Sequence, residues 1–163
     1  MKYFRYVFIV GYVFILFLIV YFAASSASES TKTSDKTTEI VIEVYDAISP
    51  TKESVKNRYS MDEISHFVRK AIGHFLLFFS LGFFASMTYI YFINKMKLRL
   101  ILSLISGIIV AIISEIIQIF AEGRGPAIKD VLLDYSGYLL STLIILLIMF
   151  LIIKKKRGKI NDS

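Results

Sequence analysis

Four apolar runs of about twenty residues constrain the fold of this chain more than any other feature. They extend from about Phe4 to Ala24, Ala71 to Ile93, Leu98 to Phe120 and Val131 to Ile153. A helix needs about 20 apolar residues to cross the hydrocarbon core of a bilayer. The sequence therefore predicts an all-α integral membrane bundle of four transmembrane helices. A cleaved signal peptide is the alternative for the first run, although that run is longer and richer in Tyr and Phe than such segments usually are.

The composition excludes several classes of function. Apolar residues make up 56% of the chain and charged residues 20%, whereas soluble domains average about 45–50% and 25%. The absence of cysteine excludes disulfides, thiolate metal sites and cysteine nucleophiles. The sequence also has no phosphate-binding loop, nucleophile elbow or dinucleotide-binding motif. The net charge of +6 is typical of basic residues that flank membrane spans, so nucleic acid is not an expected partner.

The distribution of Lys and Arg predicts the orientation. Basic residues are concentrated at 2–5, 95–99 and 154–159, which fall on one side of the membrane if four spans alternate. Because short cytoplasmic flanks carry the excess of Lys and Arg, we expect a multi-pass membrane protein with both termini in the cytoplasm. The predicted parts are a first transmembrane helix (1–24), an extracytoplasmic loop (25–70), a three-helix core (71–153) and a basic cytoplasmic tail (154–163).

The predicted extracytoplasmic loop contains three local patterns. Its Ser/Thr-rich start, residues 25–38, is typical of a flexible linker. Ser60 followed by Glu63 forms a capping-box pattern, which predicts a helix that begins at Met61 and continues into the second span. Apolar residues at helical spacing between these two segments predict a short amphipathic helix on the outer membrane surface: Ile40, Val41, Val44 and Ile48.

Polar residues inside the spans gather near their predicted outer ends. Ionisable groups within a bilayer are costly and usually face the interior of the bundle or a wet cavity. At 1.5 Å rise per residue, those in the second, third and fourth spans all lie within about 10 Å of the outer boundary. We therefore predict that their side chains converge around an Arg in the turn between the third and fourth spans. This predicted polar cluster consists of His74, Glu115, Gln118, Arg124, Asp130 and Asp134.

A stripe of small residues identifies the buried face of the third span. Ser103, Gly107 and Ala111 recur every four residues and lead to Glu115. Small residues permit close approach of helices in membranes. The face that carries Glu115 is therefore expected to pack against a neighbouring helix, and Arg124 in the tight turn is expected to pair with Glu115, Asp130 or Asp134.

At these residues the sequence resembles the VanZ family. Two positions depart from the family pattern, since Phe78 stands where Tyr is usual and Asp134 where Asn is usual. The resemblance implies a bacterial cell-envelope protein associated with resistance to the glycopeptide antibiotic teicoplanin, without implying a reaction. The matching elements run in family order: Ser25-Ser26, Arg69-Lys70, His74-Phe75, Leu81-Gly82, Glu115 with Gln118, Arg124, Asp130 and Gly137.

The sequence leaves the role of the cluster open. Four hypotheses fit the cluster: a structural hydrogen-bond network, a binding or occluding site for a lipophilic molecule, a catalytic or metal-dependent centre, or a proton-coupled transport site. The predicted function is lower sensitivity to lipophilic glycopeptides through binding or occlusion at the outer leaflet. The alternative is a membrane-embedded enzyme that modifies an envelope lipid or cell-wall precursor, with Glu115 or His74 as acid or base. Arg69, Lys70 and Gly137 are assigned supporting roles.

No metal site is predicted, because the chain lacks paired-His spacing such as H-x-x-x-H. No cofactor is expected, and no catalytic residue is assigned. The sequence does not decide whether the protein is an enzyme, although its features favour a protein without catalytic activity. The expected partners are membrane lipids, together with a lipophilic glycopeptide or a lipid-linked cell-wall precursor.

Overall fold

The computed structural model describes residues 3–49 and 54–161 of the chain, and in these residues every regular element is a helix. Four helical stretches are long and apolar enough to cross a membrane: Arg5–Ala24, Met61–Phe92, Met96–Gln118 and Ile128–Ile152. The predicted all-α bundle of four transmembrane helices is therefore confirmed.

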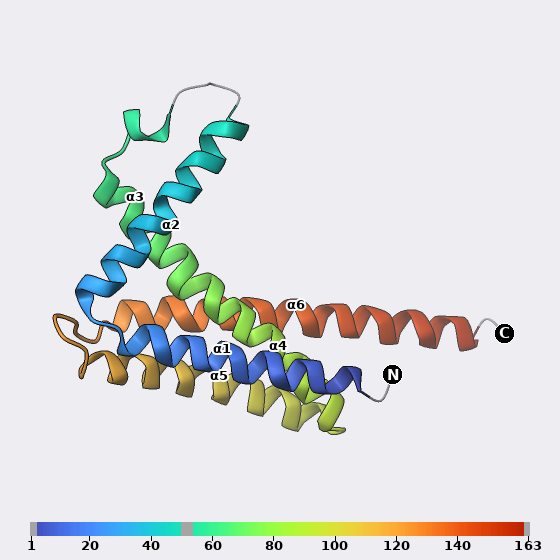
Figure 1. Ribbon diagram of the computed structural model, residues 1–163. Coiled ribbons are helices and arrows are strands. Elements are labelled where there is room, and N and C mark those ends of the chain that lie inside the picture. The colour runs from blue at the N-terminus through green and yellow to red at the C-terminus, as the bar shows by residue number, and fades with distance from the viewer. Residues whose placement is uncertain (1–2, 50–53, 162–163) are drawn as a thin grey trace.

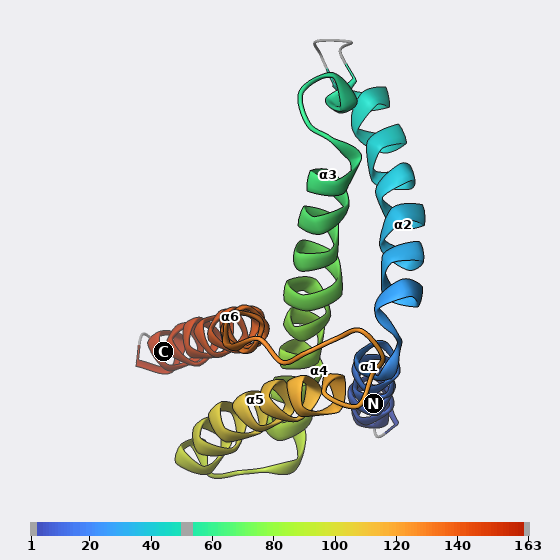
Figure 2. The ribbon, with the colours of Figure 1, turned by 90° about the vertical axis from the view of Figure 1, so that its left-hand side faces the viewer.

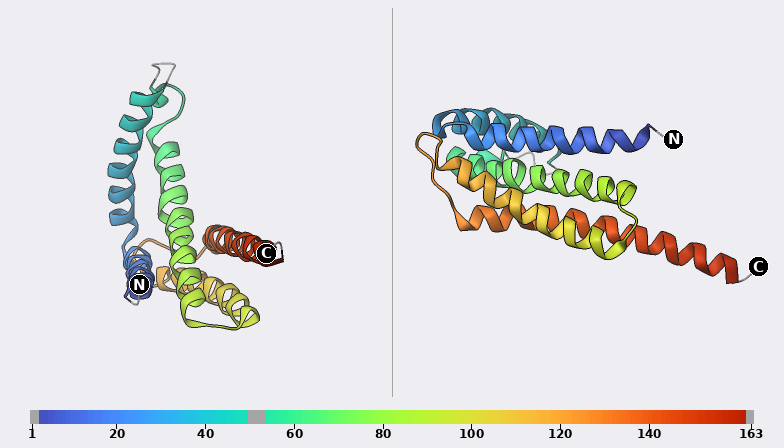
Figure 3. Two further views of the ribbon diagram at one scale, coloured as in Figure 1. Left: turned by 90° about the vertical axis from the view of Figure 1, so that its right-hand side faces the viewer. Right: turned by 90° about the horizontal axis from the view of Figure 1, so that it is seen from below.

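Helices α1 (Phe4–Ala24), α4 (Leu77–Phe92), α5 (Met96–Gln118) and α6 (Ile128–Asn161) form the bundle. Helix α1 begins and α6 ends at the same end of the bundle (Figures 1 and 3). At the opposite end α1 and α5 end and α6 begins, and we call this the hairpin end. Helix α6 continues to Asn161, so the described part of the basic tail extends the last span as helix.

A helical hairpin leaves the bundle at the hairpin end. It consists of α2 (Ala27–Ile48), a short 3₁₀ turn (η1, Val55–Asn57) and α3 (Met61–Val68). Seen along α1, the hairpin points steeply away from the bundle (Figure 2). Helix α3 then passes through a π-helical segment (η2, Arg69–Leu76) into α4 without a break. The boundary predicted between loop and core at residue 70 thus lies inside one continuous helix.

The prediction of a flexible linker over residues 25–38 is wrong, because α2 begins at Ala27. The side chain of Ser26 accepts a hydrogen bond from the Glu29 backbone N–H, and the Glu29 carboxylate accepts one from the Ser26 backbone N–H. This capping box satisfies two donors at the start of the helix. The S-x-x-E pattern that predicted the start of α3 at Met61, and is confirmed there, thus also occurs at the start of α2.

The amphipathic helix predicted around residues 40–48 falls within the C-terminal half of α2. Ile42 is buried against α3, in a small core with Ile64 and Val68. Ile40, Val44 and Ile48 are exposed in the isolated chain. Their attachment to a membrane surface stays a prediction.

Close helix contacts at three glycines hold the spans together. A Cβ added at Gly82 of α4 would lie 2.4 Å from the carbonyl oxygen of Tyr138 in α6, and one at Gly107 of α5 would lie 2.4 Å from the Tyr138 ring. At Gly137 the added atom would lie 2.4 Å from the carbonyl oxygen of Phe75. The Tyr138 hydroxyl also shares a 2.9 Å hydrogen bond with Ser106. Helix α6 therefore packs backbone to backbone against the η2–α4 helix.

Candidate functional site

The π-helical segment η2 places His74 in the bundle interior. π-Helical turns are rare and are often found at functional sites, because the wider turn shifts the side chains that follow. His74 is 8% exposed and lies at the hairpin end of the bundle. Its imidazole Nδ1 is 3.0 Å from the Asp134 carboxylate of α6. The apolar run of the second span placed His74 in a regular helix, so the π-helical turn that directs its side chain was not predicted.

Helix α5 contributes a carboxylate and an amide to the same region. Glu115 is 3% exposed and lies on the buried small-residue face, as predicted. Its Oε1 accepts a 2.6 Å hydrogen bond from the Gln118 amide. Its Oε2 accepts a 2.8 Å hydrogen bond from the backbone N–H of Ala127, just before α6. Glu115 thereby ties the end of α5 to the start of α6.

The acidic residues of α6 each meet a different partner. Asp134 is 1% exposed, and its second oxygen accepts a 3.4 Å hydrogen bond from Ser114. Asp130 forms an ion pair with Lys70, and its other oxygen lies 3.9 Å from His74 Nε2. The polar cluster predicted from the sequence therefore does converge, and His74 and the two Asp residues form its centre.

Arg124 does not occupy the central position that was predicted for it. Its guanidinium donates to the carbonyl oxygen of Phe22 at 2.8 Å and to that of Ser25 at 3.4 Å. Among the carboxylates of the described residues, Arg124 has none within 4.0 Å as an ion-pair partner, whereas Lys70 and His74 each contact an Asp of α6. Arg124 instead holds the end of α1 against the α5–α6 turn, because those carbonyl oxygens have no partner within the helix.

Two groups of site residues were missed by the sequence analysis. Ser114, which contacts Asp134, stands four residues before Gln118 and so shares its helix face. The second group is a polar face of α2, which had been taken for linker. Together with Glu29 and Lys32, four hydroxyl side chains of this face line a cavity beside His74: Ser30, Thr33, Ser34 and Thr37. The capping box at Ser26 was the signal that could have revealed this helix.

The cavity has a volume of about 420 Å³ and lies at the hairpin end between α1, α2, η2 and α4. One wall is apolar and includes Ile19, Phe22 and Leu77. The rest is polar and reaches His74 and Asp134 at the centre of the cluster. Ligand sites are concave, largely apolar and fitted with a few convergent polar groups. The cavity has this character.

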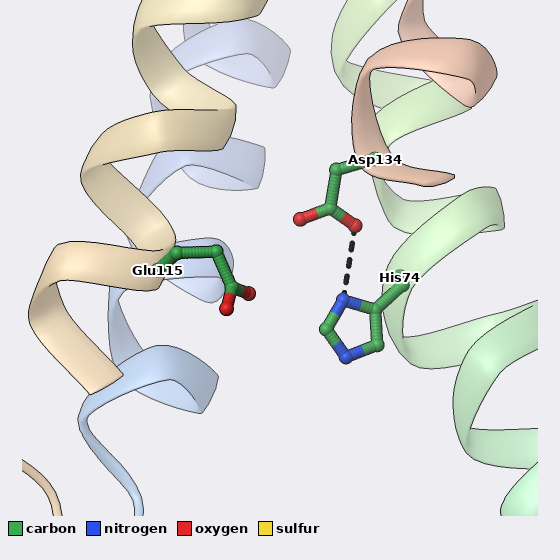
Figure 4. A group of neighbouring side chains, drawn as sticks. All are labelled: His74, Glu115 and Asp134. Atoms are coloured by element: carbon green, nitrogen blue, oxygen red, sulfur yellow. Dashed lines mark hydrogen bonds and ion pairs between the residues drawn. The ribbon is translucent and has the colours of Figure 1, made fainter. Parts of the chain in front are cut away.

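Three side chains of the cluster are close enough to share a metal ion. One donor atom each from His74, Glu115 and Asp134 lie within 4.8 Å of one another, and all three side chains point inward from separate helices (Figure 4). An imidazole nitrogen with two carboxylate oxygens suits a zinc ion. Each of these groups also has a hydrogen-bond partner within the chain, so a cation would have to replace some of these bonds. That the protein holds no metal stays a prediction.

Four apolar helices around a buried polar cluster define a multi-pass α-helical membrane protein. The model of the VanZ/LLP1 family matches residues 8–151. The match includes α1, the helical hairpin and the remaining spans, so it extends beyond the three-helix core expected at 71–153. The chain belongs to the VanZ/LLP1 family. Comparison with curated proteins and with solved structures found no match.

Proposed function

We propose that this protein lowers the sensitivity of a bacterial cell to lipophilic glycopeptide antibiotics such as teicoplanin, by binding an amphiphilic molecule at the outer leaflet. The observation that carries this proposal is the cavity at the hairpin end, whose apolar wall adjoins the polar groups of His74 and Asp134. Membership of the VanZ/LLP1 family also supports a role in antibiotic sensitivity. The occupant is a lipophilic glycopeptide or the lipid-linked cell-wall precursor that such a drug meets at this surface.

The proposal requires the hairpin end to face outward. Both termini then lie in the cytoplasm, where the basic residues at 95–99 and 154–159 are also located. This arrangement satisfies the positive-inside rule. It gives molecules of the outer leaflet access to the cavity.

Single cysteines test this orientation directly, since the native chain has none. Four exposed positions are suitable: Thr31 and Gly125 at the hairpin end, and Asn94 and Lys155 at the other end. In intact cells, a membrane-impermeant thiol reagent should label only the first two, whereas all four should label after the membrane is opened. Labelling of Asn94→Cys or Lys155→Cys in intact cells would reverse the orientation and refute an outward-facing cavity.

Filling the cavity should abolish protection against the drug. Gly73 lines the cavity, and a Cβ added there meets only Arg69 Cγ, at 3.9 Å. Gly73→Leu should therefore occupy the cavity without disturbing the helix contacts. Gly125→Leu is the matched control, since nothing lies within 4 Å of a Cβ at that position and Gly125 is outside the cavity.

The measurement is the minimal inhibitory concentration of teicoplanin in cells with equal membrane levels of each variant. We expect the control to protect as well as the native protein and Gly73→Leu to return sensitivity to that of cells without the protein. Full protection by Gly73→Leu would mean that the cavity is not the functional site.

The contact between His74 and Asp134 supports a second candidate function. A carboxylate that orients an imidazole is the arrangement used in general acid–base catalysis, and both residues border the cavity. The corresponding activity is modification of an envelope lipid or cell-wall precursor bound in the cavity. This candidate requires the charge of Asp134, whereas binding alone requires only a polar group of the same shape.

A further inference from the structure

The charges that line the cavity are unevenly neutralised. Three cationic side chains line it: Lys32, Arg69 and Arg124. Within residues 3–49 and 54–161, none of the three forms an ion pair with a carboxylate within 4.0 Å. The two acidic lining residues already have partners, because Glu29 caps α2 and Asp134 contacts His74. The cavity therefore presents excess positive charge.

The two arginines of the cavity also influence one another. The pKa of Arg124 is lowered, mainly because burial removes water from its guanidinium; the Glu115 carboxylate opposes this effect and the positive charge of Arg69 adds to it. Arginine nevertheless remains protonated in proteins. Two like charges near each other at a partly buried position are unfavourable, and an anion between them relieves the repulsion.

We propose that the cavity binds a lipid that carries a phosphate group, with the phosphate between Arg69 and Arg124 and the hydrocarbon against Ile19, Phe22 and Leu77. This inference rests on the proposed function, for which it names the chemical class of the ligand. Guanidinium groups match phosphate oxygens in two-pronged hydrogen bonds. The adjoining apolar wall favours a lipid over a free phosphate ion. The hydrocarbon of a lipid would cover the wall, whereas a phosphate ion would leave the wall exposed to water.

The position of the cavity within the chain agrees with this ligand. Arg124 lies in the turn between two spans, and Arg69 lies eight residues into the helix that begins at Met61. The apolar residues of the wall belong to the spans themselves. The phosphate would thus sit toward the membrane surface and the chains toward the hydrocarbon, which is how a lipid of the same leaflet is already oriented.

The test compares dioleoyl phosphatidic acid with dioleoyl glycerol, which has the same chains and lacks the phosphate, and with inorganic phosphate. Binding to the full-length protein in a neutral maltoside detergent is measured by native mass spectrometry. We expect phosphatidic acid to bind at least about tenfold more tightly than the glycerolipid, as the loss of charge-assisted hydrogen bonds predicts. Inorganic phosphate should neither bind at comparable concentrations nor compete.

Arg69→Gln should remove most of this preference for the phosphate. It is the more informative variant, because Arg124 also holds the end of α1 through two carbonyl groups. Lys36→Gln is the matched control: it removes one positive charge from an exposed position of α2 outside the cavity. We expect this control to bind phosphatidic acid as the native protein does.

The possible failures are distinguishable. Equal binding of both lipids, blocked by Gly73→Leu, would retain an amphiphile-binding cavity and overturn the phosphate site. Binding of inorganic phosphate as tight as that of phosphatidic acid would overturn the assignment to a lipid. Absence of binding by either lipid would overturn this inference, whereas the proposed function is overturned separately, by full teicoplanin protection in Gly73→Leu.

Discussion

His74→Ala should be the most damaging substitution in the polar cluster. It leaves the Asp134 carboxylate, which is 1% exposed, without the imidazole nitrogen that lies 3.0 Å from its Oδ1. Removing one member of a buried pair typically costs about 3–5 kcal/mol, a large share of the roughly 5–15 kcal/mol that stabilises a folded protein. We expect low accumulation in the membrane and a markedly lower thermal unfolding temperature in detergent.

One double variant and one control test whether the loss comes from the contact between His74 and Asp134. The double variant His74→Leu with Asp134→Leu should recover accumulation, since apolar residues of similar volume often replace a buried pair at little cost. His66→Ala, at an exposed position of α3, should behave as the native protein. If His74→Ala accumulates and unfolds like His66→Ala, the contact with Asp134 does not stabilise the fold.

Asp134→Asn separates the two candidate functions. The amide retains the shape and the hydrogen-bonding capacity of the carboxylate, and the resemblance to the VanZ family places Asn at this position in its usual pattern. We therefore expect a stable protein. Protection against teicoplanin should persist if the cavity only binds its ligand. It should be lost if Asp134 must orient and stabilise a charged imidazole during acid–base catalysis.

The second large loss of stability is expected when a side chain is added at Gly82, where α4 and α6 are in contact. In Gly82→Ala the new Cβ would lie 2.4 Å from the Tyr138 carbonyl oxygen, which is backbone and cannot move without moving α6. Overpacking of this kind typically costs about 1–3 kcal/mol. Alanine also favours a helix over glycine by roughly 1 kcal/mol in soluble hosts. We expect the cost of overpacking to exceed this gain, so that Gly82→Ala is less stable than the native protein. Gly82→Leu should prevent accumulation altogether.

Thermal unfolding in detergent micelles measures this effect. Gly137→Ala should resemble Gly82→Ala, since its Cβ would meet the Phe75 carbonyl oxygen at the same distance. Gly125→Ala, with open space around the new Cβ, should unfold as the native protein does. An unfolding temperature of Gly82→Ala at or above that of the native protein would show that α4 and α6 are not packed this closely.

The sequence alone determined the membrane-spanning architecture. Hydropathy is a property of each segment by itself, and a bilayer leaves a run of twenty apolar residues few alternatives to a spanning helix. The same reasoning placed His74, Glu115 and Asp134 at one depth, because helical rise is constant. The stripe of small residues identified the buried face of α5, since only small side chains allow helices to approach closely.

Only the tertiary structure decided which of these polar groups meet. Arg124 was expected to pair with a carboxylate but donates to the end of α1, because partner choice depends on how each helix is rotated and where each turn points. The π-helical turn that directs His74 toward Asp134 leaves no periodic signal in the sequence. The Ser/Thr-rich α2, with little hydrophobicity over its first half, lines the cavity only because α1 and the α5–α6 turn hold its start against the bundle.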